Sequence, residues 1–145
     1  MAEPAGRIRL EVVTPLGLVL RADVVETEAP SVLGEFGVLP GHLPLLAALG
    51  SGVLRYRTDS GTRAAAVGPG FVEAGPDKML LLTESFEKGD EVDVEQARKD
   101  LTDAEARLAG FGELHEGGAY EEILRSLAWA RARVEASEAA KAHAH

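Results

Sequence analysis

The stretch of sequence that decides the fold is Gly34-Glu35-Phe36-Gly37-Val38-Leu39-Pro40-Gly41-His42-Leu43-Pro44. It holds three glycines, two prolines and one histidine within eleven residues. Glycine is favoured where φ turns positive, and proline fixes φ and removes a backbone donor, so such a stretch does not form the middle of a regular element. We predict a long, rigid loop that exposes particular side chains. Recognition is one role for such a loop, and an ordinary connection in a β-sandwich is the alternative.

Composition limits the classes of partner. The chain has 145 residues, enough for one medium domain or a small domain with an appendage, and a net charge of −9. This acidic balance argues against nucleic acid or an anionic membrane surface as the main partner and favours protein.

The absence of cysteine excludes disulfides, thiolate metal sites and cysteine nucleophiles. With no apolar run near the ~20 residues of a membrane span and no targeting pattern, we expect a cytosolic chain, and peripheral docking on a membrane complex stays open.

The region around the opening loop has the pattern of β-structure. Residues 8–12 alternate apolar and polar side chains, which predicts a half-buried strand. The run 18–28 is rich in β-branched residues and predicts two short strands or a bulge. A hairpin is expected where Asp59-Ser60-Gly61 joins residues 53–58 to residues 62–67. The apolar run 45–49 fits either a strand or a short helical turn.

Further turn signals follow at short intervals, at residues 68–70, 75–77 and 88–90. Short apolar segments separated in this way are typical of an antiparallel sandwich or barrel. We therefore predict one all-β domain that covers about residues 8–86.

After this region the apolar period changes from two to between three and four, which indicates helices. The first helix is expected to begin near Asp93, with Gln96 completing a capping box, and to end by Gly110. The acidic residues near its start are better explained as a helix cap than as a calcium loop. Its apolar stripe is Val94, Ala97, Leu101, Ala104 and Leu108.

A second helix is expected after Gly117-Gly118, with the stripe Tyr120, Ile123, Leu127, Ala130 and Val134. Two narrow stripes joined by a short glycine-rich link predict an antiparallel helical hairpin. The fold class is thus α+β in two parts, a β-sandwich domain in residues 1–88 and a helical hairpin in residues 89–145. Because alanine buries little area, the hairpin is either docked permanently or able to leave the sandwich.

Trp129 lies off the predicted seam between the helices. Its helical neighbours three or four residues away are Arg125, Ala132, Arg133 and Ala136. A large aromatic side chain there either packs on the sandwich or anchors an interface with another protein.

A search for catalytic patterns finds no phosphate-binding loop, dinucleotide fingerprint, zinc-protease motif or nucleophile elbow. We assign no catalytic, cofactor-binding or metal-binding residues. An acid–base pair of Glu35 and His42 in a small hydrolase stays open as an alternative, although a single loop histidine is more often a structural or contact residue.

The sequence as a whole resembles the epsilon subunit of bacterial F-type ATP synthases. The most specific part is the G-x-x-G-x-x-P-G-H-x-P pattern of residues 34–44. Agreement extends to the Gly-x-Val at residues 50–53, to VGPGFV at residues 67–72, to DEVD at residues 90–93 and to the helical hairpin, so the resemblance covers nearly the whole chain.

The resemblance implies a non-catalytic rotor protein of the central stalk. The sandwich is expected to link the gamma subunit to the c-ring, so that proton flow is coupled to ATP synthesis at the cytoplasmic face of the bacterial inner membrane. By position in the motif, His42 is expected to face gamma. The c-ring contact is expected from Ser31, Val32, Leu33, Gly34 and Glu35.

The resemblance also implies that the hairpin is a mobile regulator. Docked on the sandwich it permits turnover, and extended into the catalytic alpha/beta head it restrains ATP hydrolysis. Trp129, Arg125 and Arg133 are the candidate residues for this regulation.

Some members of the family bind ATP through an Asp-x-x-Arg-Ala motif, which here reads Asp93, Gln96 and Ala97. A neutral amide does not replace a charged bidentate donor to phosphate, so we predict no tight ATP binding by the free chain. A stand-alone nucleotide-binding switch stays open as the rival function.

Overall fold

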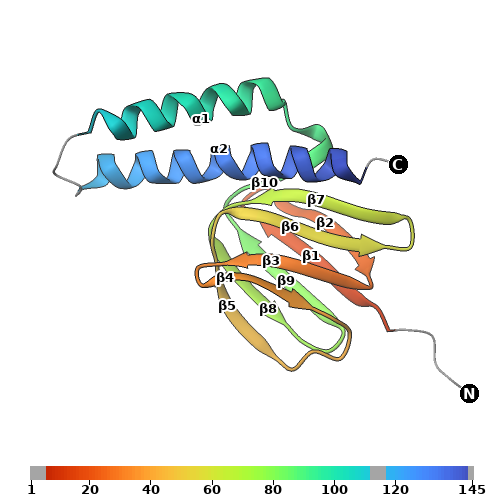
Figure 1. Ribbon diagram of the computed structural model, residues 1–145. Coiled ribbons are helices and arrows are strands. Elements are labelled where there is room, and N and C mark those ends of the chain that lie inside the picture. The colour runs from red at the N-terminus through yellow and green to blue at the C-terminus, as the bar shows by residue number, and fades with distance from the viewer. Residues whose placement is uncertain (1–5, 112–116, 144–145) are drawn as a thin grey trace, which may run out of the picture.

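A computed structural model describes residues 6–111 and 117–143 (Figure 1). It has a β-sandwich followed by two long helices. The strands are β1 (Ile8–Thr14), β2 (Gly17–Val24), β3 (Glu26–Ser31), β4 (Gly34–Val38), β5 (Leu45–Leu49), β6 (Gly52–Thr58), β7 (Gly61–Val67), β8 (Gly70–Ala74), β9 (Lys78–Thr83) and β10 (Phe86–Lys88). A 3-10 turn η1 (Gly89–Glu91) leads to α1 (Val94–Ala109) and α2 (Gly118–Ala142). This arrangement confirms the predicted fold class.

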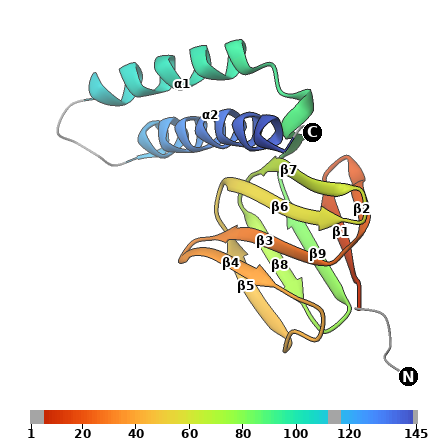
Figure 2. The ribbon, with the colours of Figure 1, turned by 45° about the vertical axis from the view of Figure 1, so that its right-hand side comes forward.

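The strands follow the order β10-β7-β6-β3-β5-β8-β9-β1-β2, and β4 pairs with β3 outside this path. All pairs are antiparallel except that of β1 with β9, which is parallel. The sheet folds over on itself into two layers, as the turned view of Figure 2 shows. The inward positions of both layers form one aliphatic core, in which the largest fully buried side chains include Ile8, Leu10, Leu49, Leu54, Met79 and Leu81.

Most of the predicted strands are present. In β1 the inward side chains Ile8, Leu10 and Val12 are buried, as the period-two pattern predicts. The run 18–28 forms two strands that separate at Val25, and the apolar run 45–49 is strand β5. The predicted hairpin is β6 and β7, where Gly61 takes a φ of 126° that an L side chain rarely adopts.

The prediction of a long loop over residues 34–44 is wrong for its first half. Gly34–Val38 forms strand β4, which pairs with β3 along its whole length. Two features explain why glycines are tolerated here. Gly34 takes a φ of 120° at the tight turn, and β4 pairs with β3 alone among the described strands, so it is an edge strand. Only residues 39–44 form a loop.

Both helices begin close to the predicted residues, and α1 also ends where it was predicted to end. The side chain of Asp93 caps α1 by accepting a hydrogen bond from the backbone N–H of Gln96 at 3.1 Å. The reciprocal bond of a capping box, from the Asp93 N–H to the Gln96 Oε1, is not formed, and the Gln96 Nε2 donates to Asp100 at 2.8 Å. Six of the ten predicted seam positions are buried, namely Ala97 and Ala104 of α1 and Ile123, Leu127, Ala130 and Val134 of α2, and the other four are half-buried.

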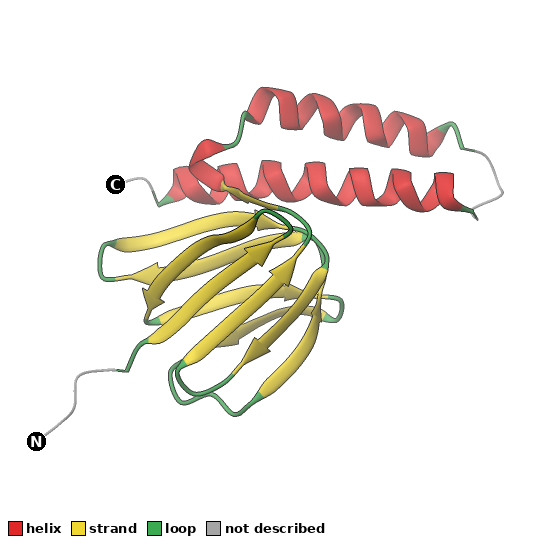
Figure 3. Cartoon of the chain, turned by 180° about the vertical axis from the view of Figure 1, so that it is seen from behind, coloured by secondary structure: helices red, strands yellow, loops and turns green. Residues whose placement is uncertain are grey.

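The second helix lies between the sandwich and the first helix. Figure 3 shows α2 resting along the end of the sandwich, with α1 on its far side. Residues of α2 pack against β6 and β7 in a second, smaller apolar cluster of Val53, Ala64, Ala66, Ala132 and Ala136. We call this set the docking cluster.

Candidate partner-binding surfaces

The turn between β3 and β4 presents two exposed apolar side chains, Val32 and Leu33, which are 66% and 96% exposed. The turn is fixed from within: the Ser31 hydroxyl donates to the Gly34 carbonyl at 2.6 Å and accepts from the Leu33 N–H at 3.1 Å. Its base is tied to the other layer, since the Val32 N–H donates to the Ala48 carbonyl at 3.1 Å. These contacts hold an apolar tip in one conformation before any partner binds.

Glu35 follows the tip on strand β4. Its carboxylate lies 3.6 Å from the guanidinium of Arg55 on β6, and both side chains are accessible to solvent. Ion pairs of this kind contribute little to stability. Glu35 is therefore available to a partner that approaches the tip.

His42 lies in the loop beyond the other end of β4. Gly41 takes a φ of 87° there, and its N–H donates to the Pro76 carbonyl at 2.8 Å, which ties the loop to the turn between β8 and β9. The half-buried His42 ring has its Nδ1 2.6 Å from the Leu43 carbonyl. No hydrogen bond or ion pair joins His42 to Glu35 in the part of the chain that the structure describes, so the geometry gives the hydrolase alternative no support.

A third surface, which no sequence motif marks, crosses the outer face of the layer that contains β5, β8, β9, β1 and β2. Register places Leu18 of β2 beside Val13 of β1, Val13 beside Leu82 of β9, and Leu82 beside Phe71 of β8. Phe71 in turn lies beside Ala48 of β5. Phe71 is 60% exposed, and Leu18 and Leu82 are also exposed. We call these five residues the apolar band.

The apolar band is continuous with the tip. It ends at Ala48, whose carbonyl accepts the Val32 N–H of the tip. The next row of the same face is mixed: Glu11 of β1 binds Arg21 of β2 at 3.0 Å and Glu73 of β8 is exposed, but the exposed Leu46 of β5 lies beside Glu73. An exposed apolar patch with charged side chains along part of its edge is typical of a protein–protein interface.

The candidate hairpin residues have different environments. Trp129 packs against the docking cluster, which is the first of the two alternatives that the sequence left open. Arg125 is exposed on α2. Arg133 reaches both neighbours of α2, because its Nε donates to Glu87 of β10 at 2.6 Å and its NH1 lies 3.3 Å from Asp100 of α1.

The degenerate ATP motif is occupied by internal contacts. Asp93 is the cap of α1, Ala97 is fully buried, and the Gln96 amide is bound to Asp100. Asp100 also binds Arg133, whose two ion-pair partners, Asp100 and Glu87, are both carboxylates. No free cation is therefore offered by these four residues to a phosphate group.

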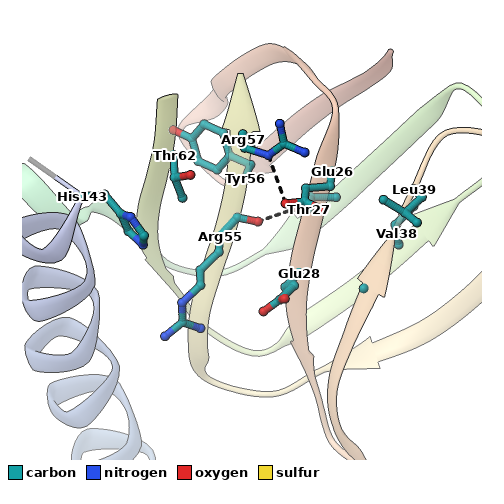
Figure 4. Close-up of a pocket in the computed structure, with 11 residues that line it drawn as sticks. Glu26, Thr27, Glu28, Val38, Leu39, Arg55, Tyr56, Arg57, Thr62 and His143 are labelled. Atoms are coloured by element: carbon teal, nitrogen blue, oxygen red, sulfur yellow. Dashed lines mark hydrogen bonds and ion pairs between the residues drawn. The ribbon is translucent and has the colours of Figure 1, made fainter. Parts of the chain in front are cut away.

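A groove of about 440 Å³ opens along strands β3 and β6, beside the end of α2 (Figure 4). Arg57 of β6 donates to its cross-strand neighbour Glu26 of β3 at 3.1 Å. Burial raises the pKa of the Tyr56 hydroxyl, an effect that Arg63 opposes and Asp90 reinforces. Other residues that line the groove are Glu28, Arg55, Thr62 and His143. The groove offers paired charges rather than an activated nucleophile.

The described residues also lack two other kinds of site. They contain no group of three or more histidine, aspartate or glutamate side chains that would hold a metal ion. Within the same ranges, neither helix has the length and apolarity required to span a bilayer. What the described surface does present is exposed apolar side chains at the tip and in the apolar band, of the kind that partner proteins cover.

Comparison with known proteins agrees with this conclusion. Residues 7–89 match the family model of the ATP synthase delta/epsilon chain, beta-sandwich domain. The chain belongs to this family. The ATP synthase epsilon chain of Nitratidesulfovibrio vulgaris is 41% identical over 127 residues, which cover 87% of this chain and 95% of that protein. The epsilon chain of Synechococcus elongatus is 38% identical over 130 residues, or 90% of this chain and 94% of its own length.

Solved structures show the same fold at lower identity. A chain in the Euglena gracilis mitochondrial ATP synthase structure of OSCP, F1 and c-ring matches with a TM-score of 0.76 and 21% identity, and the match covers 95% of this chain and 84% of that one. A chain of the Tetrahymena thermophila mitochondrial ATP synthase central stalk and c-ring matches with a TM-score of 0.58 and 13% identity, covering 91% and 99%. The match to the first structure extends well beyond the sandwich, since it covers 95% of the chain.

Proposed function

We propose that this chain is the epsilon subunit in the central stalk of an F-type ATP synthase, where it links the gamma subunit to the c-ring. It acts as an accessory subunit without catalytic residues of its own. Support comes from the family match over residues 7–89 and from bacterial relatives named as ATP synthase epsilon chains. As a peripheral part of the complex, it works at the cytoplasmic face of the inner membrane.

The apolar band is the observation that carries the proposal. Exposed Leu18, Leu82 and Phe71 belong to one continuous row, and covering such a row with a partner removes apolar surface from water. Gamma is the partner we assign to this band together with the His42 loop. The adjoining tip, with Ser31 to Glu35, is assigned to the c-ring.

Co-purification with the complex tests these assignments. Phe71→Asp places a charge at the centre of the band, and we expect recovery of gamma with the tagged chain to fall by about tenfold or more, because a buried unpaired charge costs more than 1.4 kcal/mol. Leu124→Asp, on an exposed face of α2, is the matched control and should leave recovery unchanged. Normal gamma recovery with Phe71→Asp would remove the band from the interface.

The tip and the loop have a separate test. Glu35→Lys and His42→Ala are expected to weaken coupling of proton transport to ATP synthesis, with no change in a catalytic step. Ser60→Lys, in the turn between β6 and β7, is the control because it changes another exposed turn. If proton pumping per ATP hydrolysed is normal in both variants, the assignment of the tip and loop to the rotor contacts is wrong.

We further propose that the helical hairpin restrains ATP hydrolysis when it leaves the sandwich and reaches the catalytic head. The support is physical: α2 meets β6 and β7 mainly through small side chains, so its docked and undocked positions differ by few kcal/mol. Deleting the residues beyond Gly89 should leave assembly intact and raise hydrolysis by the complex. Unchanged hydrolysis after this truncation would refute the regulatory role.

A further inference from the structure

Arg133 is the most enclosed of the ion-paired arginines in the described part of the chain. Its side chain is 15% exposed, whereas the other five arginines with ion pairs are 35 to 62% exposed. From α2, its guanidinium binds Glu87 of β10 at 2.6 Å and lies 3.3 Å from Asp100 of α1. One side chain thus joins the sandwich and both helices.

Few other polar contacts support this arrangement. Arg98 and Glu138 join α1 to α2 at 3.9 Å, but both are more than half exposed, and such pairs contribute little. In the ranges that the structure describes, the pair of Arg133 with Glu87 is the one ion pair that connects α2 to the strands. Apolar contact is made by the docking cluster, which consists of one valine and four alanines.

A close backbone contact fixes where α2 lies. Gly89 is buried in η1, and a Cβ added to it would overlap the carbonyl of Ala136 and lie 3.0 Å from the Cβ of Ala140. The backbone of α2 at Ala136 contacts this glycine directly. Because Arg133 lies about one helical turn before Ala136, this contact also places its guanidinium next to Glu87. Steric fit and ion pair therefore select the same docked position.

We infer that Arg133 is the latch of the hairpin: its ion pairs with Glu87 and Asp100 hold α2 and α1 on the sandwich, and breaking them releases the hairpin. This inference rests on the proposed regulatory function for its biological meaning, but the latch itself is a property of the free chain. Because the pair is only partly buried, salt weakens it, and the released fraction rises with ionic strength.

Hydrogen exchange of the full-length chain tests the latch. In Arg133→Gln, amides of α2 are expected to exchange about tenfold faster, since a hydrogen bond to a charged group contributes about 1.5 kcal/mol or more. Emission of Trp129, the single tryptophan, should shift to the red as the docking cluster is exposed. Arg131→Gln, two residues earlier on the exposed face of α2, should change neither signal.

Salt and the partner residues separate a latch from a general loss of stability. Exchange of α2 should quicken with added salt in the wild-type chain and lose most of this dependence in Arg133→Gln. Glu87→Gln should reproduce the release, whereas Asp100→Asn should loosen α1 and leave α2 docked. If α2 exchanges at the wild-type rate in both Arg133→Gln and Glu87→Gln, the latch is refuted. If Arg133→Gln does not fold, the exchange rate of α2 in Glu87→Gln alone tests the latch.

The assembled complex then distinguishes the latch from the proposed regulation. If released hairpins restrain the catalytic head, Arg133→Gln should lower ATP hydrolysis, the opposite of the truncation beyond Gly89. Faster exchange in the free chain with unchanged hydrolysis in both complexes would keep the latch and refute the regulatory function. Wild-type exchange with raised hydrolysis after truncation would keep the regulatory function and refute the latch.

Discussion

The core of the sandwich and the docking cluster lie on opposite faces of the same strands, and they are built from different side chains. Inside, β6 contributes Leu54 to a core of leucine, isoleucine, valine and methionine. Outside, the neighbouring Val53 meets alanines of β7 and α2. At about 0.8 kcal/mol per buried methylene, a leucine contributes roughly 2 kcal/mol more than an alanine. The chain therefore places strong burial where its structure is permanent and weak burial where an element docks.

The largest effect is expected in the core. Leu54→Ala should lower the free energy of unfolding by about 2–5 kcal/mol, because it removes fully buried atoms and leaves a cavity between the layers. Urea unfolding followed by circular dichroism measures this loss. Leu46→Ala on the exposed face of β5 is the control and should stay within about 0.5 kcal/mol of wild type. A loss below 1 kcal/mol for Leu54→Ala would contradict the assignment of the core.

A smaller and local effect is expected one residue earlier. Val53→Ala removes two methyl groups from the docking cluster, which corresponds to roughly 1–2 kcal/mol of docking free energy. Exchange of α2 amides should quicken, while the urea midpoint of the sandwich should change little. Equal losses in the hairpin and in the sandwich would mean that the two regions unfold as one unit, and the contrast between them would fail.

Features set by neighbours in the sequence could be predicted, and features set by contacts between distant segments could not. Periodicity predicts β1, the hairpin of β6 and β7 and both helices, because each is set by neighbours close in sequence. Strand β4 was missed since its glycines suit both a loop and an edge strand, and pairing with β3 decides between them. The apolar band was missed for a related reason: Leu18, Phe71 and Leu82 meet only through cross-strand register.

The candidate contact residues could be predicted from the sequence in part. The sequence places Ser31 to Glu35 and His42 near turns, and the structure adds that the tip has an internally bonded turn and adjoins the band. Their roles toward the c-ring and gamma stay predictions. For Arg133, helical spacing gives a position beside Trp129, but only tertiary packing brings Glu87, 46 residues away, to its guanidinium.

The exposed ion pair of Glu35 and Arg55 sharpens the contrast with Arg133. Glu35→Gln should change the free energy of unfolding by less than about 1 kcal/mol, because both partners are solvated and the pair is long at 3.6 Å. Thermal unfolding at low and high salt measures this change. A salt-dependent loss as large as that of Arg133→Gln would show that burial does not separate the two pairs.

The smallest expected effect is that of ATP on the free chain. A nucleotide at the start of α1 would need a cation for its phosphates, yet Gln96 is neutral and bound to Asp100, and the guanidinium of Arg133 is held by two carboxylates. Titration with ATP up to millimolar concentration should leave Trp129 fluorescence unchanged. A saturating change at micromolar ATP would refute this prediction and favour the stand-alone nucleotide switch. Gln96→Arg offers the converse test, because it adds a cation beside Asp93 and should create a measurable response if charge alone is what the site lacks.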